Sequence, residues 1–338
     1  MFQPKAALFI SIPQNGKISI IGEIFYFGIY CNGRKKQRKR GDNMNIPFHG
    51  CATALITPFR RGEVDYPALK RLIDFQIDNG VSALVACGTT GEAPTLRSEE
   101  KREIIAFTVK CARDRVPVVA GCGSPSTEFA VNFAKAARQD GASALLLVTP
   151  YYNKATDMGL FMHYNSVGEA TDIPLIAYNV PSRTGLSISK EAYSMLTEVP
   201  NFCGVKEASG NAAYAGEISA EFGDSFAVWS GCDELISPIY ALGGSGVISV
   251  LSNILPAETV ALCRACEEGS VVEAAKKQLR LMPLIKVLFS EVNPIPVKTA
   301  LHAMGFCTPE FRLPLCRMSE KNEKKLRRIM EAFELASQ

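Results

Sequence analysis

The sequence contains few of the residues that proteins use to bind a metal ion. Its 338 residues include three histidines, His49, His163 and His302, which lie far apart along the chain. The eleven cysteines are scattered without the spacing of a disulfide framework. Cys263 and Cys266 form a close pair, but no second Cys or His pair accompanies them to complete a zinc site. We therefore predict no metal and no cofactor, and interpret these two cysteines as a structural thiol pair within a helix.

The sequence also lacks a secretion signal and an apolar run long enough to cross a membrane. The apolar stretch at residues 18–31 is interrupted by Glu23 and is shorter than the roughly 18 to 20 residues that a bilayer requires. It has neither a basic leading region nor a small-residue cleavage site. We expect a cytoplasmic protein with reduced cysteines and no membrane partner.

A strong charge of one sign is missing from the main part of the chain. The formal net charge is +3, but residues 1–43 hold eight of the 37 Lys and Arg residues and two of the 34 Asp and Glu residues. The rest of the chain thus keeps 29 basic and 32 acidic side chains. A mildly acidic body gives no reason to expect nucleic acid as a partner.

The basic run RKKQRKR, residues 34–40, allows three interpretations. It is compatible with a patch for nucleic acid or a membrane surface, although a solvated charge run is the more common case. The third interpretation fits best, because Met44 begins MNIPFHGCATALITPF, which resembles a natural start. We expect residues 1–43 to be upstream sequence that is disordered or absent in the cell.

From Cys51 onward, short apolar runs alternate with longer amphipathic segments. Eight runs have the composition of strands buried on both faces, namely residues 51–59, 83–88, 117–123, 144–152, 174–181, 202–209, 226–231 and 246–253. Helical patterns such as residues 65–80, 98–115 and 126–141 lie between them. Eight strands with eight following helices predict a (β/α)8 barrel, or TIM barrel. An open doubly wound sheet is the competitor, but no G-x-G-x-x-G follows the first strand.

After Gly269 the pattern becomes wholly helical, over residues 271–290, 294–305 and 319–336. This change predicts a helical layer appended to the barrel and suited to packing on it or on another subunit. We expect a catalytic barrel at residues 44–270 and a C-terminal helical region at residues 271–338.

One lysine, Lys206, follows an apolar run at the end of the sixth predicted strand, among small residues. Chemistry in such barrels takes place at the carboxyl ends of the strands. There, desolvation lowers the pKa of an amine from about 10.4 toward about 7 to 8. A neutral amine attacks a ketone to form a Schiff base, and the protonated imine then acts as an electron sink. The alternative is a structural ion pair, for example with Glu207.

Hydroxyl and guanidinium groups follow the neighbouring strands. Tyr178 is a candidate proton shuttle, with Thr89 and Tyr152 as the rest of a hydroxyl chain. The glycine-flanked GTTG motif offers N–H groups and hydroxyls to a small carboxylate, and Arg183 can bind a second carboxylate with two hydrogen bonds. For each of them a structural role is the alternative: a packed aromatic ring, a turn threonine or a surface arginine.

Six motifs occur together: GTTGEAPTL, TPYYN, YNVPSRTG, GVKEASG, GGSGVISV and NPIPVKTAL. Their order and spacing, from about Met44 to the end of the chain, resemble the dihydrodipicolinate synthase family. The resemblance implies a lysine-dependent aldol condensation of pyruvate with L-aspartate-4-semialdehyde, the first committed step toward diaminopimelate and lysine. It also implies a homotetramer built as a dimer of dimers, and at least a dimer.

The resemblance assigns roles to positions that match the motifs of the family. It implies that Lys206 forms the Schiff base and that Tyr178 donates and accepts protons. Thr89 and Tyr152 resemble the relay, in which the tyrosine reaches in from a neighbouring subunit. The positions that resemble substrate-binding residues are Thr90 and Ile248 for pyruvate, the latter through its backbone carbonyl, and Arg183 for the carboxylate of the semialdehyde.

Two alternatives to this activity remain. N-acetylneuraminate lyase and the 2-keto-3-deoxy-sugar acid aldolases belong to the same superfamily and share the lysine and the tyrosine. Arg183, the paired Thr89 and Thr90, and the PYYN motif favour the shorter, dicarboxylate-forming reaction. A catalytically silent, ligand-sensing barrel is the alternative from another class, and the intact set of residues argues against it.

The sequence departs from the family at the positions that resemble a regulatory site. Members inhibited by lysine bind it at the dimer interface through acidic, amide and histidine side chains, and Tyr151 fits the interface tyrosine. Four neighbouring positions lack the expected groups: Ser98, Lys101, Pro125 and Phe129. We therefore expect weak or no inhibition by lysine, with Glu128 as an alternative source of a carboxylate.

Overall fold

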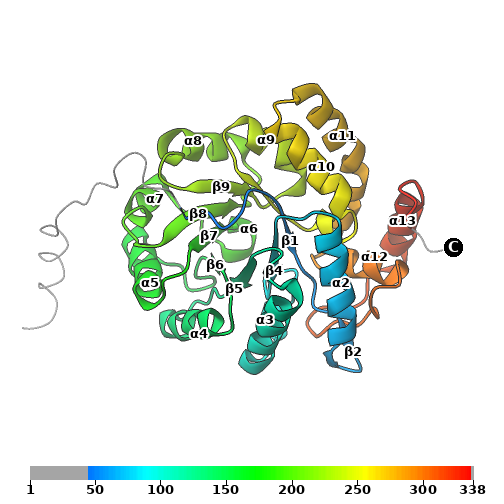
Figure 1. Ribbon diagram of the computed structural model, residues 1–338, viewed down its shortest axis with the longest axis horizontal. Helices are drawn as coiled ribbons and strands as arrows, with labels where there is room; N and C mark the ends of the chain where they lie inside the picture. The colour runs from blue at the N-terminus through cyan, green and yellow to red at the C-terminus, as the bar shows by residue number, and fades with distance from the viewer. Residues whose placement is uncertain (1–44, 336–338) are drawn as a thin grey trace, which may run out of the picture. The chain divides into compact units, whose positions relative to one another are not determined.

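The computed structural model describes residues 45–335, so the expectation for residues 1–43 lies outside the described part of the chain. Eight parallel strands close into a barrel that is surrounded by helices (Figure 1). β1 pairs with β10 on one side and β4 on the other, which closes the ring. This confirms the predicted (β/α)8 barrel. The barrel strands are β1 (Gly50–Ala54), β4 (Ala83–Ala86), β5 (Val118–Gly121), β6 (Ala144–Val148), β7 (Leu175–Asn179), β8 (Phe202–Glu207), β9 (Ala227–Ser230) and β10 (Gly246–Ser249).

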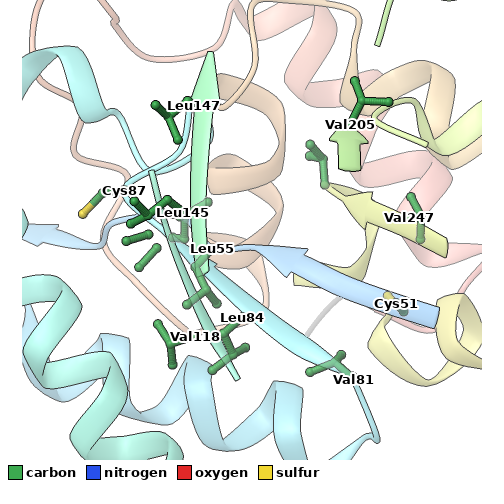
Figure 2. Packing of buried hydrophobic residues seen from close by; sticks show 14 of the residues in the cluster. Cys51, Leu55, Val81, Leu84, Cys87, Val118, Leu145, Leu147, Val205 and Val247 are labelled. Atoms are coloured by element: carbon green, nitrogen blue, oxygen red, sulfur yellow. The ribbon is translucent and has the colours of Figure 1, made fainter. Parts of the chain in front are cut away.

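The strands are short apolar runs because both of their faces are covered. Side chains alternate between the two faces of a strand, so Ala83 and Val85 of β4 belong to the cluster inside the barrel, with Trp229. Leu84 belongs to a second cluster that also contains residues of the surrounding helices, such as Leu69. Figure 2 shows part of this second cluster, to which β1, β4, β5, β6, β8 and β10 contribute alternate residues.

Helices follow the strands as the amphipathic pattern predicts. Side-chain caps begin several of them: Asp65 accepts a hydrogen bond from the backbone N–H of Ala68 at the start of α2. Gly80 and Gly141 follow α2 and α4 with φ of 82° and 94°, a backbone region that favours glycine. The helices around the barrel are α2 (Tyr66–Asp78), α3 (Ser98–Ala112), α4 (Thr127–Gln139), α5 (Asp157–Ala170), α6 (Pro181–Thr184), α7 (Lys190–Leu196), α8 (Ala212–Phe222), α9 (Ile236–Ala241) and α10 (Pro256–Glu267).

Some local structure differs from the sequence prediction or was not predicted. The first predicted strand, residues 51–59, is too long, because β1 ends at Ala54 and Phe59 begins a small antiparallel hairpin. This hairpin consists of β2 (Phe59–Arg60) and β3 (Glu63–Val64), joined at Gly62 with φ of 81°. Short 3₁₀ helices also follow three strand ends: η1 (Ala93–Thr95), η2 (Asp233–Leu235) and η3 (Leu251–Asn253).

The helices after residue 270 confirm the appended helical layer, although residues 304–319 between the last two helices are irregular. These helices are α11 (Val271–Leu288), α12 (Ile295–Ala303) and α13 (Glu320–Glu331). Cys263 and Cys266 precede them in α10 as free thiols within a helix. Within the described residues, no helix combines the length and apolar character needed to cross a membrane.

Two ion pairs attach the C-terminal region to the loop that follows β4 and to α3. The Nζ atom of Lys298, in α12, lies 2.6 Å from Oε1 of Glu92, and both side chains are fully buried. The guanidinium of Arg312 donates two hydrogen bonds, of 2.7 and 2.8 Å, to the carboxylate of Glu100 in α3. A buried charge that loses its partner is costly. These contacts therefore hold the loop between β4 and α3 against the helical layer.

Candidate active site

Lys206 lies at the carboxyl end of β8, beside Tyr178 of β7 and Trp229 of β9. Its side chain points toward the interior cluster and the residue is 5% exposed. Its Nζ atom is 4.5 Å from the centroid of the Tyr178 ring. The neighbouring Gly231 leaves room for this packing, since a Cβ there would lie 2.6 Å from Ala208 Cβ and 3.0 Å from Lys206 Cε. Lys206 is thus confined in a tight, mostly apolar site.

The charge of Lys206 is disfavoured in this position. Burial is the main reason that the pKa of its amine falls from 10.5 to about 8; Asp233 and Cys232 oppose this fall, and the positive charge of Arg183 contributes to it. Glu207, the proposed alternative ion-pair partner, instead accepts hydrogen bonds from Asn179 Nδ2 and the backbone N–H of Ser209. Among residues 45–335, no carboxylate lies within ion-pair distance of Lys206. The geometry therefore favours the neutral amine over the structural ion pair.

Tyr178 pairs with Lys206 on the neighbouring strand and lines a cavity at the barrel mouth. Burial raises the pKa of its phenol, while Arg183 and a side-chain hydrogen bond with Thr89 lower it. The net effect keeps the hydroxyl protonated near neutral pH, ready to donate a proton. The structure thus brings together Lys206, Tyr178 and Thr89, which the sequence analysis predicted to act together.

The two threonines of the GTTG motif follow β4 at the barrel mouth. Thr90 is buried, and its Oγ1 accepts a hydrogen bond of 3.0 Å from Asn293 Nδ2. The motif is closely packed, because a Cβ at Gly91 would lie 3.2 Å from the carbonyl oxygen of Leu55. Its hydroxyls and N–H groups are therefore held in a fixed arrangement.

Ile248 lies in β10 and is fully buried. The strand end after it is held by Asp233, whose carboxylate accepts hydrogen bonds from Ser249 Oγ and from the N–H groups of Val250 and Leu251. Asp233 is also buried and raises the pKa of Lys206. The sequence analysis did not identify this residue, because no local motif indicates that it pairs with another strand end.

Arg183 lies in the short helix α6, directly after β7. Its side chain is exposed, and its Nη2 donates a hydrogen bond of 3.3 Å to the backbone carbonyl oxygen of Asn293. The guanidinium is therefore placed at the mouth of the barrel, with donors left over for a ligand.

Tyr152 is not brought to this cluster within a single chain. It is 98% exposed and has a left-handed backbone with φ of 66°, a conformation uncommon for a residue with a bulky side chain. Its neighbour Tyr151 is 38% exposed. The described part of the chain therefore places the Tyr152 ring in solvent rather than beside Thr89.

A cavity of about 240 Å³ opens beside the cluster. Thr89, Tyr178 and Arg183 line it together with Lys101 and Phe129. Lys206 is not among the lining residues, although its Nζ atom lies 4.5 Å from the centroid of the Tyr178 ring. Among its described lining residues there is no carboxylate. Separately, within residues 45–335 no group of three or more His, Cys, Asp or Glu side chains is arranged to hold a metal ion.

L-Lysine is expected to inhibit the enzyme weakly or not at all, because this cavity offers its ammonium groups no carboxylate. Lys101 Nζ lies 5.7 Å from the ring centroid of Phe129, and Glu128 is exposed and does not line the cavity. An approaching ammonium group would instead meet a like charge. Activity measured against rising L-lysine tests this expectation, and half-inhibition below about 1 mM, a free energy of about −4 kcal/mol, would contradict it.

Known proteins provide an independent comparison. The model of the dihydrodipicolinate synthetase family matches residues 47–333. A 4-hydroxy-tetrahydrodipicolinate synthase of Syntrophus aciditrophicus is 45% identical over 288 residues, which are 85% of this chain and 99% of the relative. The synthase of Aquifex aeolicus is 47% identical over 289 residues, 85% of this chain and 98% of the relative.

Solved structures agree with these relatives. The crystal structure of dihydrodipicolinate synthase from Aquifex aeolicus superposes with a TM-score of 0.84 and covers 86% of this chain and 99% of its own, at 47% identity. A chloride-inhibited synthase from Acinetobacter baumannii, complexed with pyruvate, has a TM-score of 0.83 at 39% identity and covers 85% of this chain and 99% of its own. A monomeric variant is also similar, with a TM-score of 0.83 at 40% identity, covering 85% and 97%. On these matches, over nearly the full length of its relatives, the chain belongs to the dihydrodipicolinate synthetase family.

Proposed function

We propose that the chain is a 4-hydroxy-tetrahydrodipicolinate synthase of lysine biosynthesis, which condenses pyruvate with L-aspartate-4-semialdehyde through a Schiff base on Lys206. The observation that carries this proposal is the buried lysine at the end of β8. Its pKa of about 8 leaves a substantial fraction of free amine near neutral pH. The family membership supplies the reaction, and the position of Lys206 supplies the residue that begins it.

The reaction begins with attack of the Lys206 amine on C2 of pyruvate. Tyr178 donates one proton to the carbonyl oxygen and the attacking amine loses another to it, so that this oxygen leaves as water and the protonated imine forms. Loss of a proton from the methyl group of pyruvate then gives an enamine, because the protonated imine accepts the electron pair. The enamine carbon attacks the aldehyde of the second substrate, and the new alkoxide takes up a proton. The amino group of the semialdehyde then attacks the imine carbon, which closes the ring and releases the Lys206 amine. Tyr178 and Thr89 provide hydroxyls close to these proton transfers.

Three residues are proposed to bind the two substrates. The hydroxyl of Thr90 and the N–H groups of the GTTG loop suit the carboxylate of pyruvate, and the backbone carbonyl of Ile248 is proposed to contact the same molecule. Arg183 binds the carboxylate of the semialdehyde at the mouth. A sugar-acid aldolase has only the shared fold, lysine and tyrosine in its favour, and a silent barrel has only the shared fold.

We further propose that Tyr152 completes the proton relay from a neighbouring subunit in a homotetramer. Its nearly complete exposure in the single chain supports this role. Because a relative of this family is described as a monomeric variant, the assembly has to be measured for this chain.

Arg183→Ala tests the assignment of the second substrate. We expect the KM for L-aspartate-4-semialdehyde to rise about 10-fold to 100-fold, while imine formation with pyruvate changes far less, because the guanidinium contacts the later substrate. Steady-state kinetics with each substrate varied in turn measures the two effects. Arg317→Ala, in the C-terminal region, is a control that should change neither constant. An equal loss for both substrates would contradict the assignment.

A further inference from the structure

The segment between α11 and α12 places Asn293 against two groups that are proposed to bind substrates. Its Nδ2 donates a hydrogen bond of 3.0 Å to Thr90 Oγ1, in the loop after β4. Its backbone carbonyl oxygen accepts a hydrogen bond of 3.3 Å from Arg183 Nη2, in α6 after β7. Asn293 itself is 7% exposed. One residue from the C-terminal region therefore contacts two loops of the barrel mouth.

The direction of the first hydrogen bond determines what Thr90 can do. The NH₂ group of asparagine donates and cannot accept, so it occupies a lone pair of Thr90 Oγ1. The single hydroxyl proton of Thr90 is then left for a different acceptor. A carboxylate is an acceptor with no proton to donate at neutral pH. The contact with Asn293 thus prepares Thr90 as a donor to an anion.

The other side-chain atom of Asn293 gives a second, independent observation. Its Oδ1 is buried and has no hydrogen-bond partner among the described residues. An unpaired buried acceptor destabilises a fold, so asparagine is a poor choice for packing alone at this position. The favourable interaction of this side chain is the hydrogen bond that its NH₂ group donates to Thr90.

We propose that Asn293 is a positioning residue that directs the hydroxyl proton of Thr90 toward the carboxylate of pyruvate. It acts through Thr90 and does not have to touch the substrate. Its side chain serves the pyruvate site, whereas its contact with Arg183 uses the backbone carbonyl. A substitution at this position keeps that carbonyl as long as the backbone path is unchanged. This inference rests on the proposed function, because it requires Thr90 to bind pyruvate.

The separation between side chain and backbone gives a sharp test. In Asn293→Ala, the pyruvate concentration that gives half-maximal imine formation is expected to rise about 10-fold. The KM for the semialdehyde should stay within about 2-fold of the wild-type value, since the carbonyl that holds Arg183 remains. Asn293→Asp keeps the size of the side chain but accepts the Thr90 proton and adds a negative charge. It is expected to weaken pyruvate binding about 100-fold, and it serves as the second variant if the alanine variant does not fold.

The measurement is the fraction of protein trapped by borohydride at each pyruvate concentration, read by mass spectrometry, together with both KM values. Thr90→Val and the double variant with Asn293→Ala complete a double-mutant cycle. We expect no further loss from Asn293→Ala once Thr90 is valine. A purely structural role would raise both KM values together, and additive losses would show that the two residues act independently; either result overturns the inference.

The same experiment separates this inference from the proposed function. Wild-type protein that forms no imine with pyruvate would refute the proposed function itself. The role of Asn293 alone would be refuted if the wild type forms the imine and Thr90→Val loses affinity for pyruvate, while the Asn293 variants keep it.

Discussion

Replacing Lys206 with alanine is expected to lower the condensation rate at least roughly a thousandfold, as removal of a covalent nucleophile does in other enzymes. The residue is almost fully buried, and its Nζ atom lies 4.5 Å from the centroid of the Tyr178 ring. Lys101 lines the neighbouring cavity, but its amine packs over the rings of Phe129 and Phe133 instead. Lys206→Arg tests charge separately, because a guanidinium remains protonated and cannot form the imine. Lys190→Ala, at an exposed ion pair on α7, is the control and should leave turnover unchanged. Normal turnover in Lys206→Ala would refute the mechanism.

The same residue predicts how imine formation depends on pH. Burial lowers the pKa of the Lys206 amine from 10.5 to about 8. Below that pH the amine is protonated and cannot attack, so imine formation should accelerate as the pH rises through about 8 and level off above it. Rapid mixing with pyruvate at a series of pH values measures this profile. A midpoint near the ordinary pKa of a lysine would show that burial does not activate the amine.

Tyr152→Phe is expected to reduce turnover about 100-fold, the lower end of the contribution of a proton-transfer group, without unfolding the protein. The side chain is 98% exposed in the single chain, so removing its hydroxyl breaks no internal hydrogen bond. Steady-state kinetics measures the loss, and Tyr151→Phe provides a neighbouring control. An obligate monomer should be nearly as impaired as the variant if the tyrosine acts across an interface.

Mixing two inactive variants tests directly whether Tyr152 acts in the active site of a neighbouring subunit. Subunits that carry Lys206→Ala retain Tyr152, and subunits that carry Tyr152→Phe retain Lys206. In a mixed dimer, one site would then contain an intact lysine and an intact tyrosine from the partner, and activity should return on mixing. No recovery in mixed dimers, or full activity in a monomer, would rule out the proposed relay between subunits.

Much of this architecture could be predicted because it depends on local patterns. The eight strands are apolar runs that are buried on both faces, and their order along the chain is also their order around the barrel. Lys206, Tyr178 and Thr89 could be placed together because each follows a strand, and strand ends converge in a barrel. The hairpin of β2 and β3 has two residues in each strand, too few for a period to be recognised.

Contacts between distant segments could not be predicted in the same way. Asn293 and Thr90 are 203 residues apart, and Lys298 and Glu92 are 206 residues apart. Asp233 holds a strand end through backbone N–H groups, which any residue could supply. Such contacts depend on how the completed barrel packs against its C-terminal helices, and no spacing within one segment encodes them.

The formation of an imine between pyruvate and Lys206 is the central claim, and mass spectrometry of the borohydride-reduced protein tests it most directly. We expect one adduct per chain, with the mass of one pyruvate less one water and plus two hydrogens, on the peptide that contains Lys206. The adduct should disappear in Lys206→Ala. An unmodified protein, or an adduct on another lysine that persists in Lys206→Ala, would contradict the account.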